Sequence, residues 1–138
     1  MYNFFKMFHS GWAYLTILMG VLFFVVIGYY AINKKARNNL INKLSLFTVL
    51  TFHIQMILGV ILYFLSPYSN WNENTMKDSA LRLMSVEHPL MMFAAVIFIT
   101  IANSKLKKSE QVKMSSAILS LIALACMLAM IPWDTWLS

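Results

Sequence analysis

The chain has 138 residues, of which 60% are hydrophobic and only 12% are charged. Soluble domains are about 45–50% apolar and about 25% charged, so this composition excludes a disordered chain, a nucleic-acid-binding domain and an ordinary soluble enzyme. We therefore interpret the formal net charge of +6 as a signal of membrane topology rather than of a phosphate-binding surface. The single cysteine, Cys126, excludes an internal disulfide and a cysteine-based metal cluster.

Four apolar segments predict an all-α fold, an integral membrane four-helix bundle that forms one domain over residues 1–138. A helical span needs about 20 mostly apolar residues, and the segments that meet this are residues 11–32, 44–65, 81–102 and 114–133. The first segment lacks the small-x-small cleavage pattern of a signal peptide, so we expect it to remain as a helix. Short linkers make consecutive helices antiparallel neighbours, which places the first and third helices diagonally across the core.

The distribution of lysine and arginine predicts the orientation of the bundle. Eight of these residues lie in the linkers 33–43 and 103–113, and the other three are Lys6, Lys77 and Arg82. Because positive charge concentrates in cytoplasmic loops, both termini and the linker 66–80 should lie outside. This N-out/C-out topology puts all four tryptophans on the outer side, where they either anchor the bundle in the headgroup layer or wall a pocket.

Three histidines lie on three different predicted helices. His9 is at the outer end of the first helix, His53 lies inside the second, and His88 lies inside the third between Glu87 and Pro89. Ionisable groups in a bilayer are costly and point to function, although a neutral histidine can also serve as a hydrogen bond between helices. The helix rise places His53 about 15 Å, His88 about 22 Å and His9 about 35 Å above the cytoplasmic ends of their helices. By this count His53 and His88 fit one layer, His88 and His9 nearly do, and His9 and His53 do not.

Haem is the leading candidate for a ligand between these histidines. Helical bundles hold cofactors between facing helices, and histidine is a standard axial ligand of haem iron. We expect one haem b, with His88 as one axial ligand and either His53 or His9 as the other. Arg82, on the outer side, is the expected partner of the propionates. Small residues that either make room for the macrocycle or pack the helices together are Ala13, Thr16, Gly20, Gly59, Ala94 and Ala95.

The two residues that flank His88 in the sequence also suggest specific roles. Glu87 serves either as a proton-transfer group or as the ion-pair partner of Arg82. Pro89 has no N–H, so it frees the carbonyl of Ser85 one turn earlier and is expected to bend the third helix at the histidine.

Copper is a competing interpretation of the same helix. Met84, His88, Met91 and Met92 recur at helical spacing, and thioether and imidazole ligands suit Cu(I). Methionine is also a common filler of apolar cores, so the alternative to a copper site is ordinary packing.

The strings around the histidines resemble a known family. They are HSGWAYL at His9, HIQMILGVILYFLSP at His53 and MKDSALRLMSVEHPLMM at His88, together with the ending IPWDTW. They resemble small four-helix membrane proteins of Bacteroidetes-type bacteria that are labelled cytochrome b. The resemblance implies a multi-pass protein of the bacterial cytoplasmic (inner) membrane, and it adds weight to haem.

The sequence therefore predicts a membrane b-type haem protein in electron transfer, a redox component rather than a hydrolase or transferase. Its redox partner would be a quinone or a larger respiratory complex. One alternative is a cofactor-free accessory or assembly subunit of a larger membrane complex, because the segments outside the membrane are too short for a catalytic domain. The second alternative is a copper-handling membrane protein.

Overall fold

All regular structure in the computed structural model, which describes residues 1–138, is helical. The long helices are α1 (Tyr2–Ile32), α2 (Asn39–Leu65), α4 (His88–Lys107) and α5 (Met114–Ala129). Short elements are a 3-10 turn (Pro67–Ser69), α3 (Ser79–Arg82), a π-helical turn (Leu83–Glu87) and α6 (Trp133–Trp136). Three helical stretches, Tyr2–Ile32, Asn39–Leu65 and Ser79–Lys107, are long and apolar enough to cross a membrane, and α5 is a shorter apolar helix. The all-helical fold and its membrane-compatible helices are confirmed.

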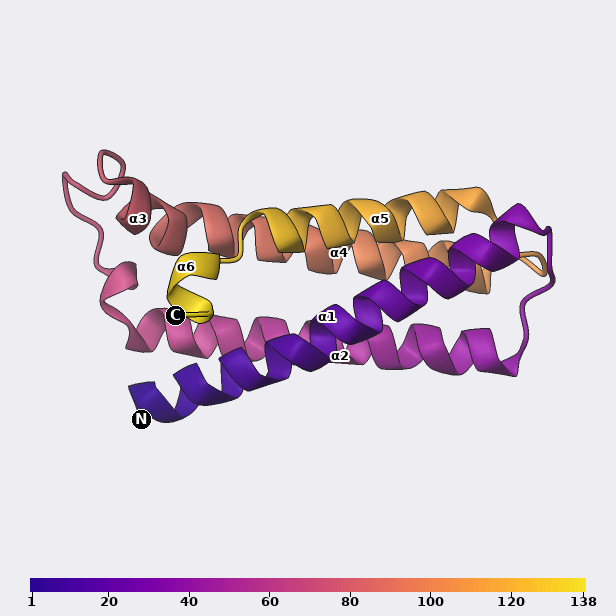
Figure 1. The fold of residues 1–138 in the computed structure, drawn as a ribbon, viewed down its shortest axis with the longest axis horizontal. Helices are drawn as coiled ribbons and strands as arrows, with labels where there is room; N and C mark the ends of the chain where they lie inside the picture. Colours follow the sequence, from indigo (N-terminus) through magenta and orange to yellow (C-terminus); the bar gives the residue numbers. More distant parts are fainter.

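Several helix ends differ from the prediction. Helix α2 begins at Asn39 rather than at residue 44, and the third helical stretch ends at Lys107 rather than at residue 102. Helix α1 begins at Tyr2 rather than at residue 11. Its 31 residues make it about 46 Å long, which exceeds the roughly 30 Å of a bilayer core, and it runs obliquely across the other helices (Figure 1). Helix α5 ends at Ala129 rather than at residue 133. Pro132 disfavours a helical conformation of the residue before it, so the chain breaks there before α6 begins.

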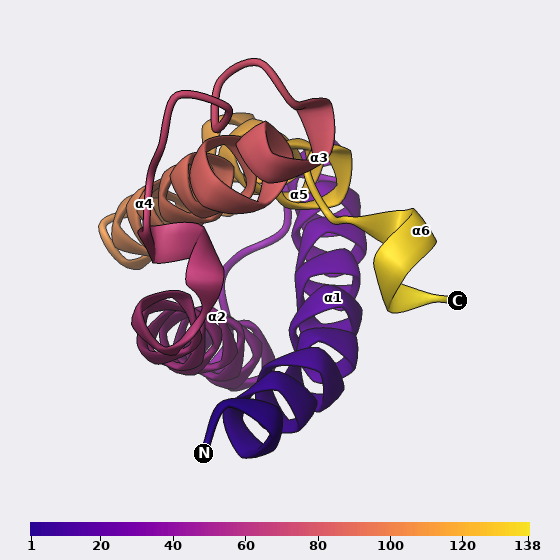
Figure 2. The ribbon, with the colours of Figure 1, turned by 90° about the vertical axis from the view of Figure 1, so that its left-hand side faces the viewer.

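The four long helices form a ring. Helix α1 packs against α2 and α5, and α4 packs against the same two helices. Figure 2 shows this ring from the end that carries both termini, with α6 on the outside beside α1. The first and third long helices of the chain, α1 and α4, therefore lie diagonally, as predicted.

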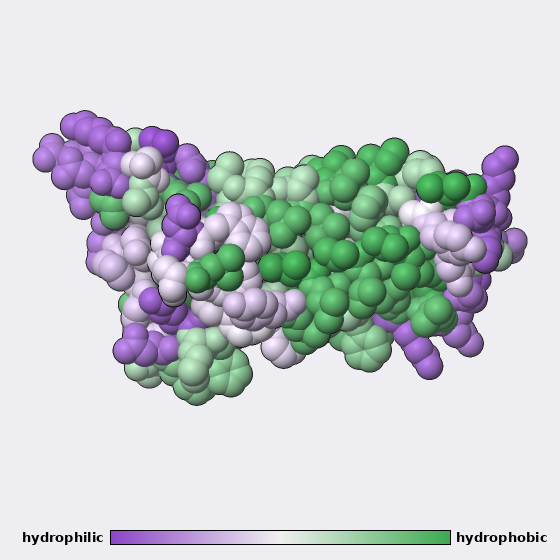
Figure 3. Space-filling model, in the orientation of Figure 1, coloured by the Kyte–Doolittle hydropathy of each residue, from purple (hydrophilic) through white to green (hydrophobic).

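The two lysine-rich linkers meet at one end of the ring, which we call the basic end. The backbone N–H of Arg37 donates to the carbonyl of Glu110 (2.7 Å), and that of Val112 donates to the carbonyl of Lys35 (3.0 Å). Hydrophilic groups gather at the two ends of the molecule and a hydrophobic surface lies between them (Figure 3). Eight positive charges thus share one end, as the topology prediction requires. Which side of a membrane this end faces stays a prediction.

The buried apolar core lies toward the basic end. Its fully buried side chains include Phe23, Ile27, Ile41 and Ile99. At the opposite end, which we call the histidine end, buried residues stop at Thr16 on α1, Phe52 on α2, Ala95 on α4 and Met127 on α5. The histidine end is therefore held together by contacts other than a buried apolar core.

Gly20 shows what the small residues of the core do. A Cβ at Gly20 would lie 2.9 Å from Cδ2 of Leu124 on α5 and 3.3 Å from the ring of Phe52 on α2. Thr16, one turn earlier, is buried and donates to the carbonyls of Trp12 (3.1 Å) and Thr51 (3.3 Å). Both positions bring helices close together, which is the packing alternative for small residues in membrane bundles.

We predict that Gly20→Leu lowers the thermal stability of the purified protein, because overpacking a closed core site costs about 1–3 kcal/mol. Gly28→Leu on the same helix is the matched control, since a Cβ at Gly28 meets nothing within 4 Å. The measurement is the midpoint of thermal unfolding in detergent. Equal midpoints for the two variants would contradict the close packing at Gly20.

Candidate functional site

His9 and His88 lie next to each other at the histidine end. Their ring centres are 6.2 Å apart and their ring planes make an angle of 84°. His9 comes from α1, and His88 is the first residue of α4, so the two imidazoles meet from diagonally opposed helices. The structure thus brings together two of the three histidines that the sequence singled out.

Helix α2 holds His9 through a glutamine and a glycine. The Nε2 of Gln55 donates to the backbone carbonyl of His9 (3.0 Å) and lies 3.5 Å from its ring Nε2. A Cβ at Gly59 would lie 3.1 Å from Cε1 of His9, so a larger residue there would require the ring to shift away from this face of α2. His9 Nδ1 and Gln55 Oε1 are both buried without a hydrogen-bond partner. Buried polar atoms rarely stay unpartnered, so this cluster is suited to a further polar group or a metal.

His88 is oriented by the end of α5. Its Nδ1 lies 2.8 Å from the carbonyl oxygen of Met130, the residue that follows α5. A carbonyl only accepts, so Nδ1 carries the proton and donates it. In the neutral ring, Nε2 then keeps a free lone pair. An imidazole that donates one N–H to a carbonyl and offers its other nitrogen is the arrangement found in metal-bound histidines.

A distorted helical turn places His88. The π-helical turn Leu83–Glu87 directly precedes it, and such turns are frequent at functional sites. Pro89 has no N–H for the Ser85 carbonyl. The hydroxyl of Tyr63 donates to that carbonyl instead (3.1 Å), and the indole N–H of Trp71 donates to the Tyr63 oxygen (2.8 Å). The Ser85 carbonyl, which Pro89 cannot donate to, thus accepts a hydrogen bond from a side chain of α2.

Arg82 and Glu87 form an ion pair at the rim of this site. Nε of Arg82 lies 2.8 Å from Oε1 of Glu87, and both side chains are about one-third exposed, at 36% and 34%. Arg82 also donates to the carbonyl of Met76 (3.1 Å). The ion-pair interpretation of Glu87 is confirmed, and a contact of Arg82 with a cofactor stays a prediction.

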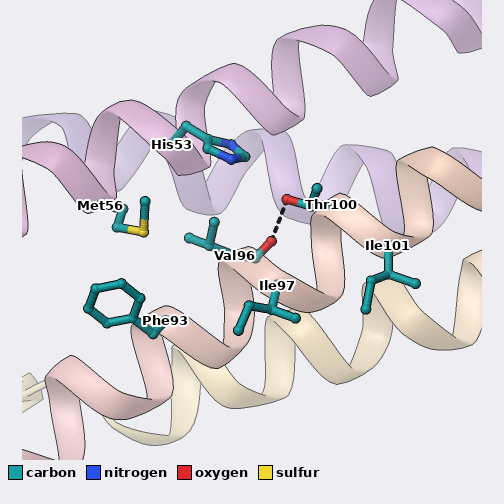
Figure 4. Close-up of a pocket in the computed structure, with 7 residues that line it drawn as sticks. All are labelled: His53, Met56, Phe93, Val96, Ile97, Thr100 and Ile101. Carbon is teal, nitrogen blue, oxygen red and sulfur yellow. Dashed lines mark hydrogen bonds between the residues drawn. The ribbon is translucent and has the colours of Figure 1, made fainter.

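His53 lies apart from the pair. Its Nδ1 bonds to the carbonyl of Val49 (2.8 Å), and its ring lines a cavity of about 330 Å³ against α4 between Phe93 and Ile101 (Figure 4). Val96 and Thr100, which it faces, follow His88 by 8 and 12 residues, or about 12–18 Å along the helix. Counting residues favoured His53 as the neighbour of His88. Because α1 is oblique, His9 lies closer to the basic end than the residue count implies.

Several contacts at this end were not predicted from the sequence. The indole N–H of Trp12 donates to the carbonyl of Thr51 on α2 (3.0 Å), so this tryptophan ties two helices together. Trp136 stacks on Tyr14 with ring centres 4.6 Å apart. The roles of Tyr63 and Met130 depend on long-range contacts that no local pattern marks. An amide in an apolar helix, Gln55, indicates a hydrogen bond to another helix, and the structure shows this bond to α1.

Met92, one of the methionines in the copper interpretation, packs against the apolar core. No group of three or more His, Cys, Asp or Glu side chains gathers in a form that could hold a metal ion. The copper interpretation stays a prediction.

Comparison with protein-family models, with curated proteins and with solved structures found no match for this chain. The resemblance carried by the histidine motifs therefore stays a prediction.

We predict that Tyr63→Phe destabilises the protein by about 1 kcal/mol, because it removes the hydroxyl that donates to the buried Ser85 carbonyl. Tyr68→Phe is the matched control, since no hydrogen bond to the Tyr68 hydroxyl is present, and its effect should stay within about 0.5 kcal/mol. The measurement is the unfolding midpoint of both variants in the same detergent. A Tyr63→Phe variant as stable as the control would show that this hydroxyl does not support the π-helical turn.

Proposed function

We propose that this chain is a membrane b-type haem protein in electron transfer, and that His9 and His88 are the two axial ligands of one haem. The separation of their ring centres, 6.2 Å, supports the proposal most strongly. A metal–imidazole bond is about 2.0–2.1 Å and a ring nitrogen lies roughly 1.1 Å from its ring centre, so two rings on opposite sides of one metal have centres about 6 Å apart.

The residues around the pair fit such a group. His9 has a buried ring nitrogen without a partner, and His88 has Nδ1 held by the Met130 carbonyl, which leaves Nε2 for a metal. Axial ligands must approach from opposite faces of the macrocycle, and diagonal helices supply that direction. The apolar side chains that the four long helices carry at this end are partly buried or exposed rather than fully buried.

Bound haem supplies one-electron transfer at its iron, and its potential depends on ligation, hydrogen bonding and burial. The chain's own groups position the two histidines. The Met130 carbonyl fixes the proton of His88 on Nδ1, and Gln55 holds the backbone at His9. The Arg82–Glu87 pair sits at the rim, where we place the propionates.

We place the protein in the bacterial cytoplasmic (inner) membrane with both termini outside. The eight lysines and arginines of the basic end support this orientation, since positive loops stay on the cytoplasmic side. The histidine end then faces outward, and the redox partner is a quinone or a larger respiratory complex of the same membrane.

We predict that protein from a haem-competent host shows a b-type α-band in its reduced-minus-oxidised spectrum. His9→Ala and His88→Ala should each remove the band, because each deletes a ligand, whereas His53→Ala should keep it. Haem content per chain is the readout, and the yield and unfolding midpoint of each variant control for folding. A band that survives His88→Ala, or one that disappears only with His53→Ala, would contradict the ligand assignment.

The competing functions predict a different spectrum. A colourless wild-type protein, with haem supply confirmed by a control cytochrome, would favour the accessory subunit. Copper bound at a constant ratio in protein purified without chelators would favour copper handling.

Gly59→Leu should lower the haem content, because its side chain would occupy the space of the His9 ring. Gly28→Leu on α1 is the matched control, since its site is open. The comparison is made on the α-band per chain at equal yield. Full haem occupancy of Gly59→Leu would show that the observed position of His9 is not the ligating one.

A further inference from the structure

The cavity at His53 lies between α2 and α4, outside the pair of histidines. It has a volume of about 330 Å³ and is lined by His53, Met56, Phe93, Val96, Ile97, Thr100 and Ile101. Figure 4 shows the imidazole projecting from α2 toward α4, with the ring of Phe93 at the other end of the cavity. Its volume is at the lower end of the range of about 300–1,000 Å³ for small-molecule sites.

The cavity opens to the outside of the bundle. Three of its lining side chains are strongly exposed, Phe93 at 46%, Ile97 at 56% and Ile101 at 39%. His53 lies near the middle of α2, a helix long and apolar enough to span a membrane. In a bilayer this opening faces acyl chains rather than water. A ligand that reaches it must therefore be soluble in lipid.

The two polar side chains of the cavity are both left as hydrogen-bond acceptors. His53 Nδ1 donates to the Val49 carbonyl (2.8 Å), so in the neutral ring Nε2 accepts. The Thr100 hydroxyl donates its proton to the Val96 carbonyl (2.6 Å), as the dashed line in Figure 4 shows, which leaves its oxygen as an acceptor. The complementary ligand is apolar and carries a hydroxyl donor.

We propose that this cavity binds the head group of a lipid-soluble quinol, with a quinol hydroxyl donating to Nε2 of His53. The planar head group would lie among Phe93, Ile97 and Val96. The oxidised quinone has only acceptor oxygens, so it lacks the donor that the cavity requires.

The site lies on a different flank of the bundle from the paired histidines, and its residues Val96 and Thr100 are about 12–18 Å along α4 from His88. Gln55, which contacts His9, follows His53 by two residues, or about 3 Å along α2. Binding of the quinol at this cavity does not rest on the proposed haem function.

The test is calorimetric titration of the protein in nanodiscs with decylubiquinol and with decylubiquinone, each corrected by titration of empty nanodiscs. We expect the quinol to bind about tenfold more tightly than the quinone, because it makes one or two hydrogen bonds that the quinone cannot. His53→Leu should abolish this preference, and Thr100→Val should reduce it.

A pair of matched tryptophan variants tests the location. Ile97→Trp places a large ring in the cavity and should weaken quinol binding at least tenfold. Ile57→Trp changes an equally exposed residue of α2 (55% exposed) outside the cavity and should bind like the wild type. Equal effects of the two variants would overturn the assignment.

The α-band of the same samples separates this inference from the haem proposal. Equal binding of quinol and quinone, or a preference that persists in His53→Leu, overturns the quinol site even if the band is intact. Specific quinol binding by a protein without the band supports the site and overturns the haem proposal alone.

Discussion

Polar groups between membrane helices must find partners on neighbouring helices, because no water is available in the hydrocarbon. The histidine end is organised by this requirement. Tyr63 of α2 donates to the Ser85 carbonyl beside α4, His88 of α4 donates to the carbonyl that ends α5, and Gln55 of α2 donates to the backbone of α1 at His9. Two buried atoms, His9 Nδ1 and Gln55 Oε1, lack such a partner. These two unpartnered atoms, which lie beside a second histidine, His88, support the proposed haem site.

The two ends of the bundle are stabilised differently. At the basic end, buried apolar side chains such as Phe23 and Ile99 and the close approach at Gly20 hold the helices together. At the histidine end, hydrogen bonds join the helices, and the apolar side chains that the long helices carry there are partly buried or exposed. A rigid apolar base that carries a polar, less tightly packed end is suited to hold a cofactor. The base fixes the helix directions, while His9 projects from α1 and His88 from the start of α4.

Part of this arrangement could be predicted from local features of the sequence. Apolar segment length indicated the helices, linker length indicated the diagonal placement of α1 and α4, and the missing N–H of Pro89 indicated a free carbonyl at Ser85. The pairing of histidines depends on helix tilt, which residue counting does not contain. His9 meets His88 because α1 is oblique, and His53 turns toward the flank between α2 and α4. The role of Gly20 in packing, rather than in making room for a macrocycle, likewise needed the positions of Leu124 and Phe52.

If His9 and His88 hold the haem as proposed, their two imidazole rings would be nearly perpendicular. Low-temperature electron paramagnetic resonance of the oxidised protein tests it most directly, because the angle between axial imidazole planes governs the g values of low-spin ferric haem. Ring planes at 84° predict a low-spin signal dominated by one large g value, present in the wild type and in His53→Ala. A high-spin signal, the rhombic signal of parallel rings, or no haem signal in haem-supplied protein would contradict the account.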